Sequence, residues 1–457
     1  MIRLVRWVWS RGLVALLLVV AVGAPPVVAA SRGGVPDAGL VLEALALLRD
    51  RYVDPVDPVA LLNGAIGGLR SSLSVAGLQV EVADIPAATP VDQAEAAFRS
   101  RFGAAQAAGG GRISSATLAY ASIRAMTATL HDSHTGFLTP DQNRERQLKQ
   151  RRQAAFSGIG VVLMPRDGRF YIRDVIPGTP AEEAGLQALD RIVRIDNLPT
   201  PGMQVEQVSN LIRGPAGTSV SLTLERPGRA EAQTVSVTRA PIQVPAIFQV
   251  RVLDGGVGYL ALHQFVNRAG LDVRRALERM LKDGMRALIL DVRANGGGYL
   301  HELTTVLNSL LPAGRPVYQE TTRGGQTRTT RTFGVPTLPS HMPLMVLIDE
   351  STASAAELLA AALQEQGRAT LLGAKTSGAV EASVLYDLSD GSALSITILR
   401  LTTGLGKRLE GVGVSPDVPV ALTSADLDQG RDTQLQRAIL WVRQRLGLAA
   451  TRVPSSR

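Results

Sequence analysis

The chain of 457 residues contains no cysteine. It therefore cannot form a disulfide bond or use a thiol nucleophile, which suits an exported protein that avoids oxidation chemistry. Aromatic residues make up only 4% of the chain, and no aromatic-rich basic run occurs, so the sequence carries no nucleic-acid-binding signature. No set of potential ligands has the spacing of a metal site, and no cofactor is implied.

Apolar residues are plentiful, at 45% of the chain, which is enough for two to three domains with real cores. At the N-terminus three arginines precede an apolar run at residues 12–28, and small residues follow. Residues 1–30 are therefore expected to be a signal peptide. The alternative is an uncleaved membrane anchor, although Pro25 and Pro26 break the run and it is short for a span. Either way the body is expected in the periplasm or cell envelope.

Apolar spacing predicts helices in the first part of the chain, at residues 40–51, 58–72 and 114–130. Residues 73–112 are expected to be a loop-like insertion with a helix near 91–102, and the charged residues 144–152 are interpreted as a hinge. Short strands around a small helix are expected between 157 and 239. From residue 258 continuous apolar strands alternate with helices, which predicts strands buried on both faces.

These patterns predict a mixed α/β protein with five parts. The boundaries are a signal peptide (1–30), an N-terminal helical region (31–150), a small β-rich domain (151–245), an α/β core (246–425), and a C-terminal helix with a tail (426–457).

Ser354 is the first candidate for a catalytic residue. It lies in a turn of small residues after an apolar strand and before a helix, where a hydroxyl can be exposed and where a helix N-terminus favours developing negative charge. The alternative is structural, because Ser354 and Glu357 have the spacing of a capping box.

Several segments, in order, resemble the carboxyl-terminal processing (tail-specific) serine proteases. They are FSGIGVVL (156–163), GTPAEEAGL (178–186), LILDVRANGGG (288–298), DESTASAAELLAAALQEQGRATLLGAKTSG (349–378) and EGVGVSPDVPV (410–420). The resemblance implies a ClpP/crotonase-like α/β catalytic core with an inserted PDZ domain at 151–245. It also implies that Ser354 is the nucleophile.

The chain departs from this family at the position of the general base. Lysine-dependent members carry Thr-x-Gly-Lys after a short strand, and here the fourth residue is Ala379. A glutamine usual four residues later is replaced by Ser383. Lys375 lies nearby in sequence, but it matches a position that is not catalytic in the family, and four residues displace a side chain by several ångström.

A second branch of the superfamily, the tricorn-core type, uses Ser-His-Glu, and its pattern is present here. Ser133 and His134 lie in DSHT, and Glu410 opens EGVGVSPD. A serine hydroxyl needs a neutral imidazole to take its proton, and the imidazole needs a carboxylate to orient it. The resemblance implies His134 as base, Glu410 as orienting acid and Ser133 as an auxiliary group. The alternatives are an ordinary turn histidine and a surface carboxylate.

Two glycine-rich segments are expected to present backbone amides. The N–H of Gly297, together with that of Ala355, would form an oxyanion hole, although a tight strand-to-helix turn is the alternative. Gly296 replaces a proline common in the family. The other segment, Ser157, Gly158, Ile159 and Gly160, would bind the C-terminal carboxylate of a substrate beside an open strand edge; here the alternative is a plain folding module.

The sequence thus indicates an exported serine endopeptidase that acts on protein or peptide substrates recognised by their C-termini. The alternative from another class is a pseudo-protease that retains PDZ peptide binding and has lost catalysis with its lysine. Membrane proximity would come from the N-terminal segment. The sequence leaves the substrate and the formation of a homo-oligomer open.

Overall fold

The computed structural model describes residues 36–132, 134–155 and 157–448, and these form two compact units. The first unit contains the described residues up to Pro140, with Thr322–Gly325 and Glu381–Arg400. The second contains Asp141–Thr321, Gln326–Val380 and the described residues from Leu401 onward. The expected signal peptide at 1–30 and the candidate Ser133 lie outside the described residues.

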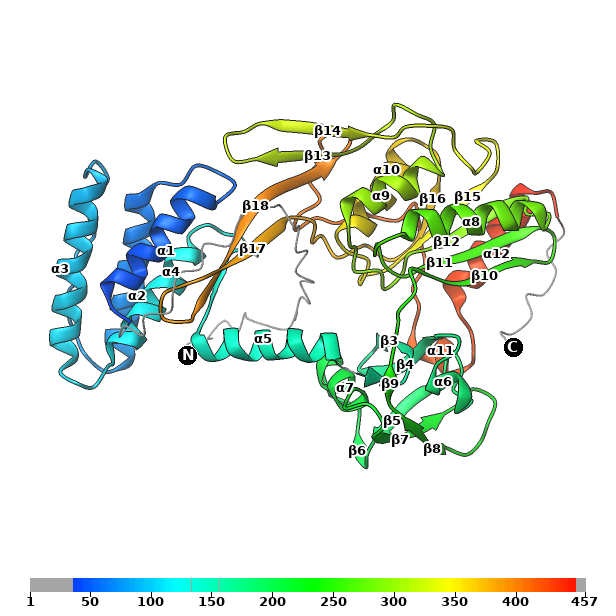
Figure 1. Ribbon diagram of the computed structural model, residues 1–457, viewed down its shortest axis with the longest axis horizontal. Coiled ribbons are helices and arrows are strands. Elements are labelled where there is room, and N and C mark those ends of the chain that lie inside the picture. Colours follow the sequence, from blue (N-terminus) through cyan, green and yellow to red (C-terminus); the bar gives the residue numbers. More distant parts are fainter. Residues whose placement is uncertain (1–35, 133, 156, 449–457) are drawn as a thin grey trace, which may run out of the picture. The chain divides into compact units, whose positions relative to one another are not determined.

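The first unit is built on four helices that are close together in the sequence (Figure 1). The helices are α1 (Ala38–Arg51), α2 (Pro58–Val75), α3 (Val91–Gly109) and α4 (Ser115–Ala128). The side chains of Asp37, Asp57 and Ser114 accept backbone N–H groups at the starts of α1, α2 and α4. Gly68 lets α2 approach α4 closely, since a Cβ there would lie 2.4 Å from the Ala121 carbonyl oxygen.

Two sequence-based expectations in this part of the chain were wrong. The helix expected near 91–102 is present as α3, but the segment around it is less loop-like than expected, because α3 continues to Gly109 with Phe98, Phe102 and Ala105 buried in the core of the first unit. The charged stretch expected as a hinge lies inside helix α5 (Pro140–Ala155). The first unit also holds β1 (Gly136–Leu138) and β17 (Ala382–Asp387), which both pair antiparallel with β18 (Ala393–Thr403).

A small β-rich module opens the second unit. Its main sheet has the order β3-β4-β5-β7-β8, and β6 pairs with β5. The strands are β2 (Ser157–Gly158), β3 (Val161–Arg166), β4 (Arg169–Val175), β5 (Arg191–Ile195), β6 (Leu198–Pro199), β7 (Ser219–Glu225), β8 (Gln233–Thr238) and β9 (Ala240–Pro241). Helices α6 (Pro180–Glu183) and α7 (Val205–Ile212) accompany them.

The core of the second unit is a six-stranded sheet that is parallel from β11 onward. Its order is β10 (Ile247–Leu253), β11 (Val257–Leu262), β12 (Ala287–Asp291), β15 (Leu344–Ile348), β16 (Thr370–Gly373) and β19 (Val418–Pro419). Every residue of β11, β12 and β15 is buried, as their continuous apolar runs predict. The hairpin β13 (Pro316–Thr322) and β14 (Thr327–Arg331) extends from this core.

Helices cover both faces of this sheet. Helix α12 (Thr433–Arg445) packs on the face that carries Tyr259, Ile289 and Met345. Helix α8 (Ala269–Lys282) lies on the other face, where a Cβ at Gly258 would meet Met280. The remaining helices are α9 (Leu300–Asn308), α10 (Ala355–Glu365) and α11 (Ser424–Asp428). The carboxyl ends of the parallel strands share one edge, where α/β proteins place their sites.

The β-rich module is joined to the core by a buried charge cluster. Arg173 of β4 contacts Asp291 of β12 at 3.1 Å, and Arg293 contacts the same carboxylate at 2.7 Å. Burial alone would raise the pKa of Asp291, but the two guanidinium groups hold it well below its usual range.

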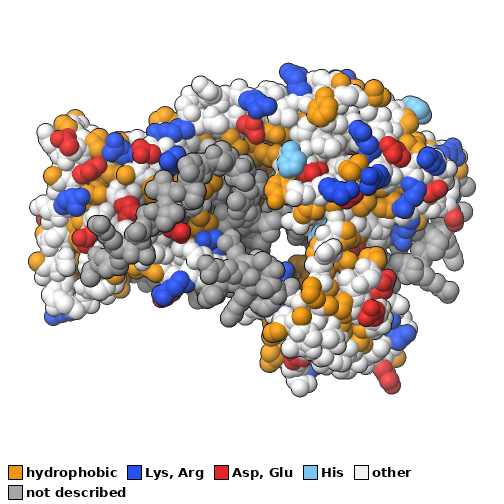
Figure 2. Space-filling model, viewed as in Figure 1, with side chains coloured by type: hydrophobic (Ala, Val, Ile, Leu, Met, Phe, Trp, Pro, Cys, Tyr) orange, Lys and Arg blue, Asp and Glu red, His pale blue; other side chains and the backbone are white. Residues whose placement is uncertain are grey.

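On the face drawn in Figure 2, basic and acidic side chains are interspersed over this unit. No described helix is long and apolar enough to cross a membrane.

Candidate active site

Ser354 lies at a strained turn between β15 and α10. Its backbone angles are φ 56° and ψ −124°, whereas a helix N-cap ordinarily has extended backbone with negative φ. Two backbone hydrogen bonds maintain this turn: the Ala353 N–H donates to the Asn295 carbonyl and the Ser354 N–H donates to the Ala379 carbonyl, both at 2.9 Å. A strained turn between a strand and a helix is the conformation that exposes a nucleophilic serine hydroxyl in α/β-hydrolases.

Glu357 connects the nucleophile turn to the segment that follows β16. Its fully buried carboxylate accepts the Ser354 N–H at 3.1 Å, as a capping box would have it, and also the N–H groups of Gly378 at 2.7 Å and Ala379 at 2.9 Å. Burial raises the pKa of Glu357, and the hydrogen bonds oppose that rise. The capping pattern and a catalytic Ser354 are therefore compatible, because the carboxylate binds backbone on both sides of the serine.

Ala379, at the position of the family lysine, is directly beside the nucleophile turn. Its carbonyl accepts the Ser354 N–H, and its side chain is buried. Lys375 is exposed, and Ser383 lies in β17 of the first unit. The second unit therefore places an alanine methyl group where lysine-dependent members have an amine.

Glu410 also contacts the segment that follows β16. Its Oε2 accepts the Val380 N–H at 2.9 Å, and the following Gly411 N–H donates to the Gly378 carbonyl at 2.8 Å. Ser354, Ala379 and Glu410 are thus brought to one region of the second unit, although they are 56 residues apart at the extremes of the sequence.

The amides expected to form the oxyanion hole differ in their present partners. Gly297 has φ 95°, and a Cβ there would lie 2.6 Å from Ser354 Cβ, so this backbone is against the nucleophile. The Gly297 N–H donates to Asn295 Oδ1 at 2.8 Å, whereas no described residue accepts the Ala355 N–H. Asn295 is fully buried, and its Nδ2 donates to the Leu262 carbonyl at 2.8 Å. The sequence analysis did not predict this role of Asn295. The adjacent run of glycines was the one signal in the sequence that could have indicated it.

His134 belongs to the first unit, and its backbone is held by two side chains of that unit. Its N–H donates to Asp132 and its carbonyl accepts the Ser395 hydroxyl. Among the other histidines, burial together with Arg173 lowers the pKa of His263 to about 4. His131, His301 and His341 are exposed.

The β-rich module offers an open strand edge with backbone amides at its start. Strand β3 pairs with β4 and has no second partner strand among the described residues. Ser157 and Gly158 pair with β9, whereas the N–H groups of Ile159 and Gly160 have no acceptor within the described part of the chain. Gly160 has φ 92° and packs on Thr179, since a Cβ would lie 2.2 Å from the threonine Oγ1.

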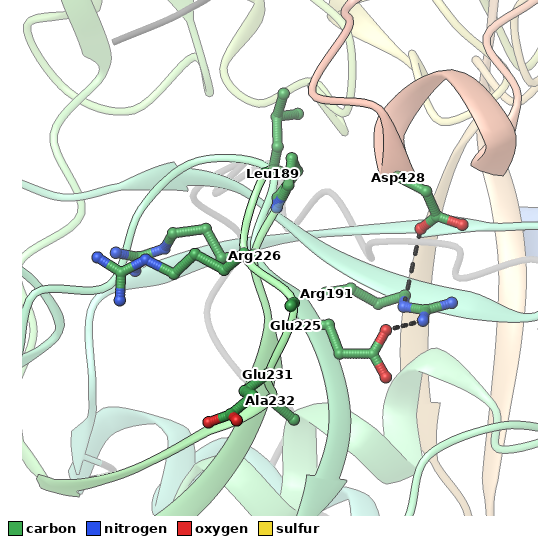
Figure 3. A pocket seen from close by; sticks show the side chains of 11 residues that line it. Leu189, Arg191, Glu225, Arg226, Glu231, Ala232 and Asp428 are labelled. Carbon is green, nitrogen blue, oxygen red and sulfur yellow. Dashed lines mark hydrogen bonds and ion pairs between the residues drawn. The ribbon is translucent and has the colours of Figure 1, made fainter.

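A cavity of about 440 Å³ lies in the same module, between β5, the β7–β8 turn and α11 (Figure 3). Its charged groups neutralise one another: Arg191 contacts Glu225 and lies 3.7 Å from Asp428, while Arg226 binds Asp190. None of the expected catalytic residues lines this cavity. No group of His, Asp and Glu within the described residues could hold a metal ion.

Comparison with known proteins identifies the family of this chain. Residues 256–420 match the model of peptidase family S41, and residues 171–226 match a PDZ domain. The carboxyl-terminal-processing protease of Synechocystis sp. is 33% identical over 326 residues, which cover 70% of this chain and 76% of that protein. The chain belongs to the carboxyl-terminal processing protease family. It is a serine peptidase, as the resemblance of its motifs predicted.

Two further relatives extend this comparison. The Bacillus subtilis carboxy-terminal processing protease CtpB is 29% identical over 300 residues, covering 65% of this chain and 62% of that protein. The solved structure of the photosystem II D1 C-terminal processing protease aligns with a TM-score of 0.50 and 28% identity, covering 84% of this chain and 92% of that one. The predicted fold class, an S41-type core with a PDZ domain and an N-terminal helical region, is therefore confirmed. The Ser-His-Glu assignment stays a prediction.

Proposed function

We propose that this family member is an exported endopeptidase that binds the C-terminus of a protein or peptide with its PDZ domain and cleaves through an acyl-enzyme. The observation that carries the proposal is the strained Ser354 turn, with a positive φ, next to the Ala355 N–H, for which the described part of the chain supplies no acceptor. Positive φ at a non-glycine residue is unfavourable and persists where the surrounding hydrogen bonds require it. Here those bonds come from Asn295, Ala379 and Glu357, and they direct the serine away from an ordinary cap geometry.

The proposed chemistry is acyl transfer. Ser354 Oγ attacks the scissile carbonyl carbon while His134 takes its proton, and the imidazolium then donates that proton to the leaving amine. Water repeats the two steps on the ester and releases the serine. The Ala355 N–H would donate to the oxyanion, and the Gly297 N–H would join it after leaving Asn295.

A histidine base is favoured because the lysine position cannot supply one. Ala379 has no ionisable group beside Ser354, and Lys375 is exposed. Glu410, which is bound to the neighbouring Val380 N–H, is well located to orient an imidazole that approaches this segment. In this proposal His134 is the base, Ser354 the nucleophile and Glu410 the orienting acid, with Ser133 as an auxiliary group.

The PDZ domain supports recognition of chain termini. The N–H groups of Ile159 and Gly160, which find no acceptor among the described residues, can bind a terminal carboxylate, and the edge of β3 can pair with the residues before that carboxylate. Ser157 and Gly158 would support this loop through their pairing with β9. The expected leader at 1–30 supports export, and membrane proximity or a homo-oligomer would be an additional property.

The test is labelling with a fluorophosphonate probe and turnover of a peptide with a free C-terminus. Ser354→Ala should abolish both, and His134→Ala should lower turnover by about 10³-fold or more, which is the scale of losing a triad member. Glu410→Gln should lower turnover less. Lys375→Ala is the matched control and should behave as wild type.

The same measurements decide between the proposal and its alternatives. If wild-type protein labels no better than Ser354→Ala, the proposed catalytic activity is wrong. The result would then favour the pseudo-protease alternative, for which the comparisons give no support. If His134→Ala keeps full turnover while Lys375→Ala loses it, the base is the lysine. If the PDZ domain binds the terminal carboxylate, a peptide whose C-terminal carboxylate is esterified should have a higher KM than the same peptide with a free C-terminus.

A further inference from the structure

The backbone around His134 is fixed by hydrogen bonds on both of its sides. On the N-terminal side, Asp132 Oδ1 accepts the His134 N–H at 2.9 Å. On the C-terminal side, the His134 carbonyl accepts the Ser395 hydroxyl at 2.7 Å, and the next-but-one residue, Gly136, pairs with Ser395 in the sheet. The peptide groups that flank the histidine are therefore both held by side chains.

Asp132 also binds a second group besides the His134 amide. Its Oδ2 accepts the Thr135 hydroxyl at 2.7 Å. Thr135 Oγ1 in turn accepts the Thr397 N–H at 3.0 Å, which ties the turn to β18. The Asp132 carboxylate thus holds the histidine turn directly and is linked through Thr135 to the neighbouring strand.

The charges around this turn favour the same arrangement. Burial raises the pKa of Tyr52, and the carboxylates of Asp132, Asp54 and Glu381 raise it further, so the phenol stays protonated. Arg400 pairs with Asp54 and lies 3.5 Å from Glu381. The Asp54 and Glu381 carboxylates therefore share the Arg400 guanidinium. The hydrogen bonds that Asp132 accepts from the His134 N–H and the Thr135 hydroxyl come from neutral donors.

We propose that Asp132 is a positioning residue for the His134 base: its carboxylate fixes the backbone from which the imidazole extends. The proposal rests on the proposed role of His134. A base must lie within hydrogen-bond reach of the proton it removes, and a displacement of about 1 Å can lower a rate by about 10²-fold. Asp132 itself touches no reacting atom in this scheme.

The first unit offers a matched control in Asp57. Its carboxylate also accepts the N–H of the residue two positions later, Val59, at 2.9 Å, but it caps α2. Asp132→Ala and Asp57→Ala therefore remove the same type of local hydrogen bond from the same unit. Only the first change should alter catalysis.

The experiment measures kcat and KM for a peptide substrate, normalised to folded protein by thermal melting. We expect Asp132→Ala to lower kcat by about 10²-fold with KM within about threefold, and Asp57→Ala to lower melting temperature without lowering kcat. Asp132→Asn should recover at least about tenfold of the loss, because the amide oxygen can still accept the His134 N–H. Should Asp132→Ala fail to fold, Ser395→Ala provides the second variant, with an expected loss of about tenfold in kcat.

The outcomes separate this proposal from the proposed function. If His134→Ala is inactive but Asp132→Ala keeps the kcat of Asp57→Ala, the positioning role is wrong and the base assignment stands. If His134→Ala keeps full kcat, both are wrong. A loss in Asp132→Ala that appears only in KM, or that Asp132→Asn does not recover, also overturns the positioning role.

Discussion

Substitution of Gly297 by alanine should inactivate the enzyme while leaving it folded. The added Cβ would lie 2.6 Å from Ser354 Cβ, 2.9 Å from the Ala355 nitrogen and 3.0 Å from the Ala353 oxygen. Carbon atoms that are not bonded prefer about 3.5–4.0 Å, so the serine turn must move by about 1 Å. A displacement of that size at a nucleophile lowers a rate by about 10²-fold, or about 2.7 kcal/mol in activation free energy.

Two further terms act on stability. Overpacking of a close-packed site costs about 1–3 kcal/mol, and the φ of 95° at Gly297 adds strain for any residue with a side chain. Part of this strain can relax, because the clashing Ser354 turn is half-exposed. We therefore expect a folded protein with a lowered melting temperature.

Gly296 is the matched control for this prediction. A Cβ there meets no heavy atom within 4 Å, so Gly296→Ala should keep wild-type labelling by a fluorophosphonate and near wild-type turnover. The assay compares the second-order labelling rate and kcat/KM of both variants. Equal activity of Gly297→Ala and Gly296→Ala would refute the inference that the Gly297 backbone is against the nucleophile.

Three other predictions follow from the described contacts. Ala379→Lys in the His134→Ala background should restore part of the turnover measured with a peptide substrate, since residue 379 adjoins Ser354, and no gain would mean that a lysine there cannot reach the hydroxyl. Arg173→Met should lower the free energy of unfolding by about 3–5 kcal/mol in denaturant titrations, because it leaves Asp291 without one buried partner; an unchanged midpoint would contradict that. The pKa of His263 is about 4 when folded and 6.5 otherwise, so stability should be full above pH 6.5 and fall by about 3 kcal/mol as pH drops toward 4, a slope that His263→Gln should flatten.

The sequence predicted the strands and turns whose formation follows from their own local residue pattern. Strands β12 and β15 consist wholly of buried residues, and their unbroken apolar runs indicated this. The turn at Ser354 was likewise signalled by small residues between an apolar strand and a helix. Long-range resemblance of motifs in their order then gave the family, which no local pattern could give alone.

Features that depend on tertiary packing were not predictable from local pattern. Helix α3 extends through Gly103, which has low helix propensity, because Phe98, Phe102 and Ala105 face the core of the first unit. Helix α5 is highly charged, so it lacks the apolar periodicity by which helices are predicted. The sequence analysis therefore gave only the first part of α3 as helix and interpreted the charged part of α5 as a hinge.

The contacts that define the site join residues far apart in sequence. Glu357 was predicted to bind the Ser354 amide, but its bonds to Gly378 and Ala379 required knowledge of where β16 ends. Asn295 was unforeseen for the same reason, since it accepts the Gly297 N–H and its own carbonyl accepts the Ala353 N–H. A sequence motif can nominate the residue types at a site, whereas the partner of each amide follows only from the fold.

The alanine in place of the lysine has a structural consequence beyond the loss of an amine. A lysine base on the segment after β16 would belong to the same unit as the nucleophile, and the Glu357 carboxylate already fixes that segment to the Ser354 turn. A base on the DSHT turn belongs instead to the first unit, where Asp132 and Ser395 fix its backbone. The proposed histidine base therefore differs from a lysine at residue 379 in belonging to another unit than Ser354, and Asp132 and Ser395, rather than Glu357, would fix the backbone that carries it.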